Sequence, residues 1–359
     1  MKINQFDPYL TRDEISSVME VLRDNWITEG KKTEEFKKML QDYCGVKYAI
    51  LLPNGTLALY VGLMILGIGP GDEVIVPDFT FAGSATAVVL TGAKPVFADV
   101  NLHDFNLDIG SLQKCISART KAIMPVHIYG QSAEMDKVLR IARTHRLKVI
   151  EDAAQGIGVS FGNRHVGSLG DVGILSFYAD KTITTAEGGA LLTNSRFLAE
   201  ECIYLRNQGR LSRGSFIHPK MGYNFRFTDL QAALGVAQMR KLSFIIEKKL
   251  HIEGYYKQFL KEAEEVRSPE VTTHGKRVPF RINILVKDPK GLGGFLQKKG
   301  IGVRRFFYPL HRQPCFNKEN CIRLTSYPHS DEIFASGLSL PSGVRLTKKQ
   351  IRQICDQIK

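Results

Sequence analysis

The sequence lacks the features of a secreted, membrane-spanning or disulfide-stabilised chain. Its six cysteines show no CxxC spacing and no histidine partners at metal-ligand distances, which predicts reduced thiols and no metal site. The N-terminus, MKINQFDPYLTRDE, has no apolar core of the signal-peptide type. The longest apolar run, 57–68, is too short for a bilayer, which needs about 20 residues. These absences favour a cytoplasmic protein with no membrane partner.

No block of like charges occurs either, although the chain is basic. Lysine and arginine number 49 and aspartate and glutamate 36, which gives a formal net charge of +13 over 359 residues. The basic residues are scattered, and the chain has no nucleic-acid-binding motif and no interleaving of aromatic and basic residues. We therefore expect no nucleic-acid partner, and the net charge favours a phosphorylated small molecule as the anionic partner.

Strand and helix patterns alternate over the first part of the chain, after two helices predicted at 11–24 and 33–44. The predicted strands are 47–52, 73–76, 95–99, 121–126 and 148–152, and the helices between them are 57–66, 82–91 and 133–145. This alternation predicts an α/β fold with an open, mostly parallel sheet. Ligands of such sheets bind beyond the carboxyl ends of the strands, so the turns that follow strands are the places to search for a site.

The composition changes after Arg226, which predicts a second, smaller domain. The predicted elements there are a long helical stretch from Thr228 to about Leu260, strands at 280–286 and 303–307, and helices at 290–300 and after Thr347. The long helix begins with a capping box and links the two parts. We expect a large domain over 1–240, including the N-terminal helical segment, and a smaller α+β domain over 241–359.

A single lysine stands between two apolar, strand-like runs in the segment 173–194, GILSFYADKTITTAEGGALLTN. Lys181 follows the first run within four residues and precedes a Thr-rich turn. A loop lysine usually extends its charge to water. Among apolar and hydroxyl neighbours, however, its amine can be neutral and can add to a carbonyl group. The choice depends on whether the chain supplies the other contacts of a carbonyl cofactor.

Asp152 and Gln155 are candidates for two of those contacts. Asp152 ends the strand 148–152, where a buried carboxylate is costly unless it is paired. It can cap the segment that begins at Ala153. Alternatively, it can pair with a protonated pyridine nitrogen, whose charge makes the ring a better electron sink. Gln155 lies three residues further on and can reach a ring hydroxyl.

Phosphate binding is predicted at the turn between the first strand and its helix. Backbone amides at a helix N-terminus and the hydroxyl of Thr56 can bind a phosphate beside Gly55, although turns of this kind are also common connectors. Ser176, five residues before Lys181, can add a second hydroxyl. Phe81 is either a core aromatic residue or a side chain that stacks on a flat ring.

These motifs together resemble the DegT/DnrJ/EryC1/StrS family of pyridoxal-phosphate-dependent sugar aminotransferases. The resemblance extends over nearly the whole chain: WITEG near 26, NGT at 54, VPDFTF at 76, PVHIYGQ at 125, VIEDAAQ at 149, SFYADKTITTAEGG at 176, GYNFRFTDLQAALGVAQ at 222 and LSLPS at 338. It implies the fold type I, aspartate-aminotransferase-like architecture, with a large, mostly parallel seven-stranded sheet domain and a smaller C-terminal α+β domain.

The resemblance also implies roles for individual residues toward the cofactor. Lys181 would carry pyridoxal 5'-phosphate covalently and move the proton. Asp152 would pair with the pyridine nitrogen, Gln155 would bind the ring hydroxyl and Phe81 would stack on the ring. The phosphate would be held by Gly55, Thr56, Ser176 and, from the partner subunit of a homodimer, Asn224.

For the substrates, the resemblance implies L-glutamate as the amino donor and a nucleotide-linked 4-keto-6-deoxyhexose as the acceptor. The runs LLPNGT and FYADKTITTAEGG look closest to the GDP-perosamine synthases of the family, which aminate C4 in the synthesis of surface polysaccharides such as O-antigen. Arg226 is a candidate contact for the nucleotide phosphates or part of a structural ion pair. Trp26 and His311 either line the sugar pocket or are ordinary surface or core residues.

Two other functions stay open, a sugar 3-aminotransferase acting on UDP- or dTDP-linked substrates and a non-catalytic regulator with the same fold. Lys181 argues for transamination, because a dehydratase branch of the family has histidine there. The sequence departs from the family pattern at Ile157, where many members have a histidine near the sugar. It departs again at Ala186, which replaces a common glycine and which we expect to be a small steric change.

Overall fold

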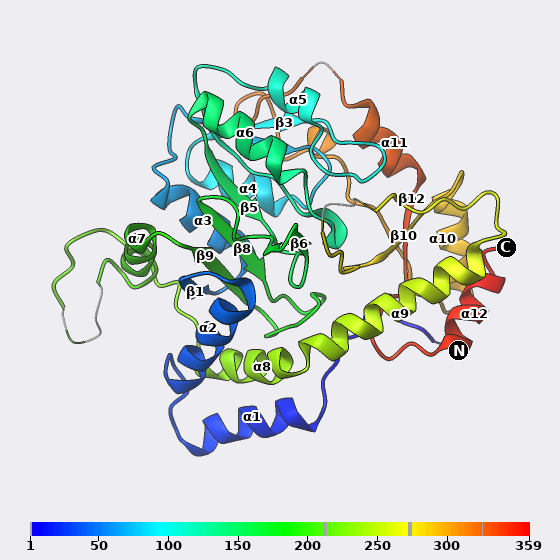
Figure 1. The fold of residues 1–359 in the computed structure, drawn as a ribbon, viewed down its shortest axis with the longest axis horizontal. Helices are drawn as coiled ribbons and strands as arrows, with labels where there is room; N and C mark the ends of the chain where they lie inside the picture. The colour runs from blue at the N-terminus through cyan, green and yellow to red at the C-terminus, as the bar shows by residue number, and fades with distance from the viewer. Residues whose placement is uncertain (1, 211–213, 215, 272–274, 325) are drawn as a thin grey trace.

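A seven-stranded sheet forms the centre of the molecule in the computed structural model, which describes residues 2–210, 214, 216–271, 275–324 and 326–359 (Figure 1). In spatial order the strands are β1 (Tyr48–Leu52), β9 (Gly189–Thr193), β8 (Val172–Ser176), β5 (Lys148–Asp152), β4 (Thr120–Ile123), β2 (Glu73–Pro77) and β3 (Lys94–Ala98). Only β9 runs against its neighbours in this sheet, because it pairs antiparallel with both β1 and β8 while the other pairs are parallel. The predicted large, mostly parallel sheet is confirmed.

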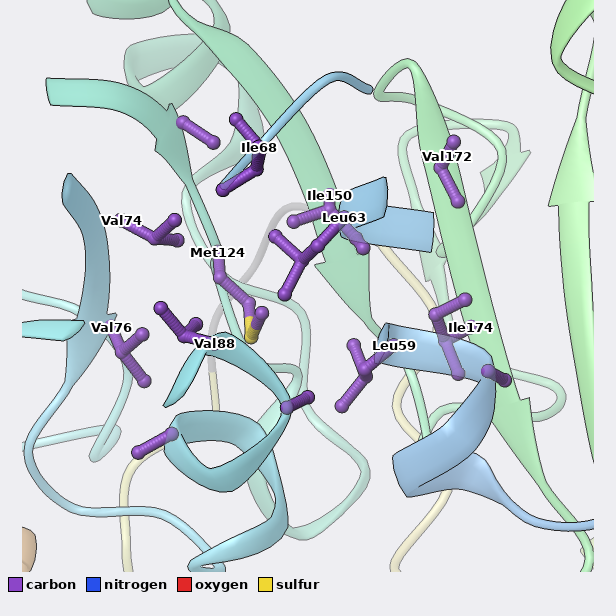
Figure 2. Packing of buried hydrophobic residues seen from close by; sticks show 14 of the residues in the cluster. Leu59, Leu63, Ile68, Val74, Val76, Val88, Met124, Ile150, Val172 and Ile174 are labelled. Carbon is purple, nitrogen blue, oxygen red and sulfur yellow. The ribbon is translucent and has the colours of Figure 1, made fainter. Parts of the chain in front are cut away.

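Helices cover both faces of this sheet. They are α1 (Arg12–Arg23), α2 (Lys31–Cys44), α3 (Gly55–Ile65), α4 (Gly83–Leu90), α5 (Ile109–Lys114), α6 (Met135–His145), α7 (Arg196–Arg206) and α8 (Asp229–Arg240). Figure 2 shows how α3 and α4 pack on one face: Leu59 and Leu63 lie beside Ile174 and Ile150, and Val88 lies beside Val76 and Met124. Successive strand residues point to opposite faces, so Ile50 packs on the α3 side and Leu51 on the α2 and α8 side. Burial of both faces explains the near-continuous apolar runs of the strands.

The predicted helix starts near the N-terminus are confirmed, and the second has an unexpected cap. The capping box of Thr11 and Glu14 opens α1. At the start of α2, the Asp229 carboxylate of α8 accepts the backbone N–H groups of Gly30, Lys32 and Thr33. A carboxylate at a helix N-terminus satisfies otherwise unpaired donors and is favoured by the helix dipole. This contact fixes the turn before α2 against α8.

A second sheet of three antiparallel strands lies beyond a long helix. The elements are α9 (Leu242–Leu260), β10 (Ile282–Leu285), α10 (Pro289–Lys298), β11 (Arg304–Arg305), α11 (Pro328–Ser336), β12 (Gly337–Leu340) and α12 (Lys348–Asp356), with sheet order β10-β12-β11. In Figure 1, α9 runs from the large sheet region to α12. Ile3 also packs in the cluster formed by α9, α12 and this sheet. The division of the chain at residue 240 stays a prediction.

The helical stretch predicted from Thr228 to about Leu260 begins and ends as expected, but it is not continuous. It is two helices, α8 and α9, which separate at Lys241. Lys241 has φ −114° and ψ 15°, outside the helical region, and its ammonium group binds Glu14 and the hydroxyl of Thr11 on α1. The break therefore results from a tertiary contact, since the sequence has no proline or glycine at this point. The strand predicted at 303–307 is also shorter, with only Arg304–Arg305 paired.

The remaining regular elements are short. They are the hairpin strands β6 (Ser160–Phe161) and β7 (Arg164–His165) and the single helical turns at Ile128–Gly130 and Leu310–Arg312. Across the parts of the chain that the structure describes, no helix combines the length and apolar character needed to cross a membrane.

Candidate active site

A cavity of about 800 Å³ opens where β2, β5 and β8 end, between the large sheet and residues of the second sheet. Its lining includes most of the predicted cofactor contacts, namely Gly55, Thr56, Phe81, Asp152, Gln155, Ser176 and Lys181. The turns after the strands thus meet at one place, as the parallel topology requires.

Lys181 lies in the connection from β8 to β9, and its side chain reaches into this cavity. The Nζ atom is 4.7 Å from the centroid of the Phe280 ring. Burial lowers the pKa of the Lys181 amine, and the nearby Arg281 acts in the same direction. The carboxylates of Asp180 and Asp152 oppose the shift, but the pKa remains below its ordinary value. A larger fraction of the amine is therefore neutral, which is the form that reacts with a carbonyl group.

Asp152 ends β5 with its side chain buried at the cavity. Its Oδ2 atom accepts a hydrogen bond of 2.7 Å from the Ser84 hydroxyl, and Oδ1 accepts one of 3.1 Å from the backbone N–H of Ala154. The segment after Asp152 is a turn and not a helix, and the bond from Ala154 caps this turn, so Asp152 makes the predicted capping contact and also faces the cavity. Ser84, on α4, also lines the cavity, and the sequence reasoning missed it. The only signal was its position one helical turn after Phe81.

Gln155 is held in a defined orientation. Its Oε1 atom accepts a hydrogen bond of 2.7 Å from the backbone N–H of Tyr129. Because only the amide oxygen can accept this bond, the Gln155 NH₂ group is the part left to donate. A donor at this position suits a ring oxygen, and the contact of Gln155 with the ring hydroxyl stays a prediction.

The N-terminus of α3 packs closely against the end of β8. Asn54 caps the helix by accepting the backbone N–H of Leu57, which leaves the amides of Gly55 and Thr56 without acceptors inside the helix. A Cβ atom at Gly55 would lie 3.0 Å from the Cβ of Ser176, so glycine permits the close approach of the two segments. Amides at a helix N-terminus with two hydroxyls beside them suit a phosphate group.

Phe81 is not a core residue. It follows β2 on the wall of the cavity, and 61% of its surface is exposed. Its ring lies 6.1 Å from that of Phe307, which lines the same cavity. An exposed aromatic face at this place favours the stacking role over the core role.

Four predicted site residues lie outside the cavity. Trp26 lines a separate open groove of about 1460 Å³ beside α2 and donates its ring N–H to the Glu29 carbonyl. Asn224 is exposed, and Arg226 donates to the side chain of Asn207. His311 contacts the buried Asp78 carboxylate through Nδ1 at 2.7 Å.

The second sheet supplies charged residues that the sequence reasoning also missed. Arg281, Arg304 and Arg305 line the cavity opposite the strand ends, and Asp180 contacts two of them. Arg281 and Asp180 are 101 residues apart in the chain. Nothing in the local sequence around either residue indicated this meeting.

These groups fit a phosphorylated pyridine aldehyde. The cavity joins an amine of lowered pKa, a buried carboxylate, an amide donor, an aromatic wall and a helix N-terminus with hydroxyls. On a sheet of this topology, they define a fold type I enzyme that uses pyridoxal phosphate.

The chain belongs to the DegT/DnrJ/EryC1/StrS aminotransferase family, whose sequence profile matches residues 8–359. A GDP-perosamine synthase of Caulobacter vibrioides is 37% identical to it, over 98% of this chain and 96% of that protein. A dTDP-3-amino-3,6-dideoxy-alpha-D-galactopyranose transaminase of Aneurinibacillus thermoaerophilus is 33% identical, over 94% and 92%. The crystal structure of S. venezuelae DesV in complex with a ketimine intermediate matches with a TM-score of 0.91 and 30% identity, covering 97% of this chain and 93% of that one. The protein is therefore a pyridoxal-phosphate-dependent sugar aminotransferase, as the resemblance implied.

Proposed function

We propose that this protein transfers the amino group of L-glutamate to C4 of a GDP-linked 4-keto-6-deoxyhexose, in a GDP-perosamine-type reaction that supplies a surface polysaccharide. The main support for transamination is that the Lys181 amine, whose pKa is lowered, lines the same cavity as the Asp152 carboxylate. The GDP-sugar and the C4 position are supported by the relatives named GDP-perosamine synthase, at 33% to 37% identity over nearly the whole chain.

The predicted cofactor contacts in the cavity would each have a part in this reaction. When bound, pyridoxal phosphate supplies a ring that withdraws electrons from the carbon next to the transferred nitrogen. Lys181 would hold the cofactor and then, as a neutral amine, accept and return the proton at Nζ. Asp152, fixed by Ser84, would face the pyridine nitrogen with its negative charge. Gln155 would donate to the ring oxygen.

The wall and the phosphate site would orient the cofactor. The first turn of α3 with Thr56 and Ser176 would bind the phosphate, which fixes one end of the ring. Phe81 would cover a ring face and exclude water from the reacting carbon. Fixing the ring at several points would keep the reacting group close to Lys181, which would accept and return the proton.

The active enzyme is proposed to be a homodimer in which each subunit completes the other's site. Asn224 is exposed and does not line its own chain's cavity. Phe216, Ile217 and Met221 on the same loop are also exposed, which supports contact of this loop with a second copy. Trp26 lines the groove beside α2, and Arg226 follows this loop and donates to Asn207, which lines the same groove. We propose Trp26 and Arg226 as contacts for the nucleotide sugar across the interface. For His311, held by Asp78, the structure offers no such support.

A cytoplasmic location is part of the proposal. All six cysteines are free and five of them are buried. Unpaired thiols support a reducing compartment.

One alternative reaction has a specific observation in its favour. The relative from A. thermoaerophilus is named a transaminase for a 3-amino sugar, and it is 33% identical to this chain. Amination at C3 is therefore the second candidate. A non-catalytic regulator has less support, because such a role does not require the Lys181 amine, Asp152 and the phosphate site to lie in one cavity.

The test is incubation of the purified holoenzyme with L-glutamate and a panel of 4-keto-6-deoxy sugars linked to GDP, UDP or dTDP. Mass spectrometry would detect the amino sugar, and NMR of the product would assign the nitrogen to C4 or C3. We expect an amino product from the GDP-linked substrate, with nitrogen at C4. A product only from dTDP- or UDP-linked sugars, or nitrogen at C3, would replace the proposal, and no turnover with any substrate would favour the regulator.

A further inference from the structure

We propose that Arg281 and Arg304 bind a carboxylate group of the amino donor, in exchange for the Asp180 carboxylate that they hold in this structure. The inference rests on the proposed use of an amino acid as donor, and it names the residues that would recognise it. Asp180 precedes Lys181 directly, while Arg281 precedes β10 and Arg304 lies on β11. All of them line the cavity.

Arg281 is a fixed cation in this cavity. Its Nη2 atom lies 2.9 Å from Oδ2 of Asp180, and only 5% of its surface is exposed. The guanidinium carbon lies 5.0 Å from the Phe280 ring centroid and 5.6 Å from that of Phe307. Two aromatic rings thus set the plane of the guanidinium group. A buried cation of this kind needs an anion beside it at all times.

Arg304 is held more loosely by the same carboxylate oxygen. Its Nη1 atom lies 3.4 Å from Oδ2 of Asp180, and 55% of its side chain is exposed. Each guanidinium group carries five N–H donors, whereas Asp180 accepts one contact from each arginine. One oxygen of Asp180 thus serves both arginines, whereas the guanidinium fork matches a carboxylate in a bidentate geometry, so a donor carboxylate that takes the place of Asp180 can make more contacts. The weak contact to Arg304 is the one that an incoming ligand can displace.

The position of Arg281 favours the donor carboxylate over the nucleotide diphosphate, which is also an anion. Asp180, the anion that Arg281 now holds, directly precedes Lys181, and Lys181 Nζ and the Arg281 guanidinium both contact the Phe280 ring, so the anion site lies close to the amine where the nitrogen is transferred. The carboxylate of an α-amino acid is attached to the reacting carbon. The diphosphate of a nucleotide sugar is separated from its C4 carbon by the sugar ring. A site next to Lys181 therefore suits the amino acid.

The experiment measures the half-reaction, in which the holoenzyme reacts with L-glutamate and no sugar substrate is present. The absorbance of the cofactor reports its progress. Glutarate, a five-carbon dicarboxylate without an amine, is the unreactive probe, and its inhibition constant reports binding directly. The variants are Arg304→Gln, Arg304→Lys, Arg281→Gln and Asp180→Asn. Arg196→Gln, which removes an exposed ion pair on α7, is the matched control. Because the half-reaction uses no nucleotide sugar, an error in the proposed sugar substrate would not affect the result.

We expect Arg304→Gln and Arg281→Gln to raise both the KM for glutamate and the inhibition constant of glutarate by about tenfold or more, since a charge-assisted hydrogen bond is lost. Arg304→Lys should fall between Arg304→Gln and the parent protein. Asp180→Asn should act in the opposite direction and tighten glutarate binding, because it removes the competing carboxylate. Binding of GDP, UDP or dTDP should change much less, and Arg196→Gln should resemble the parent protein.

Two results would overturn the proposal. One is unchanged glutarate binding in Arg304→Gln, a partly exposed side chain whose replacement is compatible with folding. The other is a loss of nucleotide binding equal to the loss of glutarate binding, which would assign the two arginines to the diphosphate. A melting temperature and a cofactor spectrum like those of the parent protein would show that each variant is folded.

Discussion

The hydroxyl of Ser84 donates a hydrogen bond of 2.7 Å to the Asp152 carboxylate. Ser84 belongs to α4 and Asp152 ends β5, so the bond joins two walls of the cavity across 68 residues of sequence. Both side chains are buried. The bond therefore fixes the orientation of the carboxylate that is proposed to face the pyridine nitrogen.

We expect Ser84→Ala to weaken cofactor binding and to slow turnover, each by about tenfold, because loss of a partner to a buried charged group costs about 1–3 kcal/mol. Titration of the apoenzyme with pyridoxal phosphate, followed by visible absorbance, would give the dissociation constant. The rate of the glutamate half-reaction would give the effect on turnover.

Thr86→Ala on the same helix is the matched control. Thr86 is only partly buried and does not line the cavity. Its replacement should leave both measurements unchanged. Equal effects of the two substitutions would show that any change in α4 impairs cofactor binding and turnover. The hydrogen bond from Ser84 to Asp152 would then have no specific role.

Lys181→Ala should abolish transamination without unfolding the protein. The variant has no amine to hold the cofactor or to move the proton, so turnover should fall by several orders of magnitude. The visible absorption of the covalently held cofactor should disappear, while the circular dichroism spectrum stays that of the parent protein. Turnover close to that of the parent would remove Lys181 from the proposed role.

The sequence was informative about groups that follow strand ends. Gly55, Asp152 and Lys181 each follow or end a strand, and a parallel sheet gathers such positions at one edge. Their meeting could therefore be predicted without knowledge of side-chain packing. The family resemblance then assigned their roles.

Contacts that depend on packing between distant elements could not be predicted. Arg281 reaches Asp180 because the segments before β10 and after β8 line the same cavity, and the local pattern of neither segment indicates that they meet. Lys241 ends a helix because Glu14 and Thr11 bind its amine, although its neighbours are good helix formers. In each case a tertiary contact, absent from the local sequence, decided the structure.

Ala186 has a backbone conformation that the replacement of glycine by alanine did not reveal in the sequence. The expectation of a small steric change was incomplete, because Ala186 has φ +69°, in the left-handed region. A Cβ atom in this region costs about 1–2 kcal/mol, which glycine avoids. The common glycine of the family pattern therefore serves the backbone turn.

Ala186→Gly is accordingly expected to stabilise the protein. The relief of strain should exceed the extra entropy that glycine gains in the unfolded chain, for a net gain of roughly 0.5–1 kcal/mol. The free energy of unfolding in urea would measure it. Ala335→Gly, at an exposed position of α11, is the control and should destabilise by up to about 1 kcal/mol. Destabilisation by both replacements would show that Ala186 is not strained.

Lys249 is a buried lysine that the proposed reaction does not use. It lies on α9, and its Nζ atom donates to the backbone carbonyl of Phe280 at 3.1 Å. Burial lowers the pKa of Lys249 to about 8 from the usual 10.5; Arg281 acts in the same direction and Asp180 opposes it. In the unfolded chain the amine keeps the usual value, so between pH 8 and 10.5 the unfolded state binds more protons than the folded state. The energetic cost of burying Lys249 is therefore complete below pH 8 and decreases as the pH rises toward 10.5.

Lys249→Met should remove this cost, and it should do so in a pH-dependent way. At pH 7 we expect a gain of roughly 2 kcal/mol in the free energy of unfolding, after allowance for the lost hydrogen bond to Phe280. At pH 10 the gain should be much smaller, because the parent protein then carries a neutral amine. Urea unfolding at both pH values would measure the difference, with Lys248→Met, an exposed neighbour on α9, as the control that should show no such dependence. Destabilisation of equal size at both pH values would mean that the hydrogen bond to Phe280, and not the buried charge, determines the contribution of Lys249.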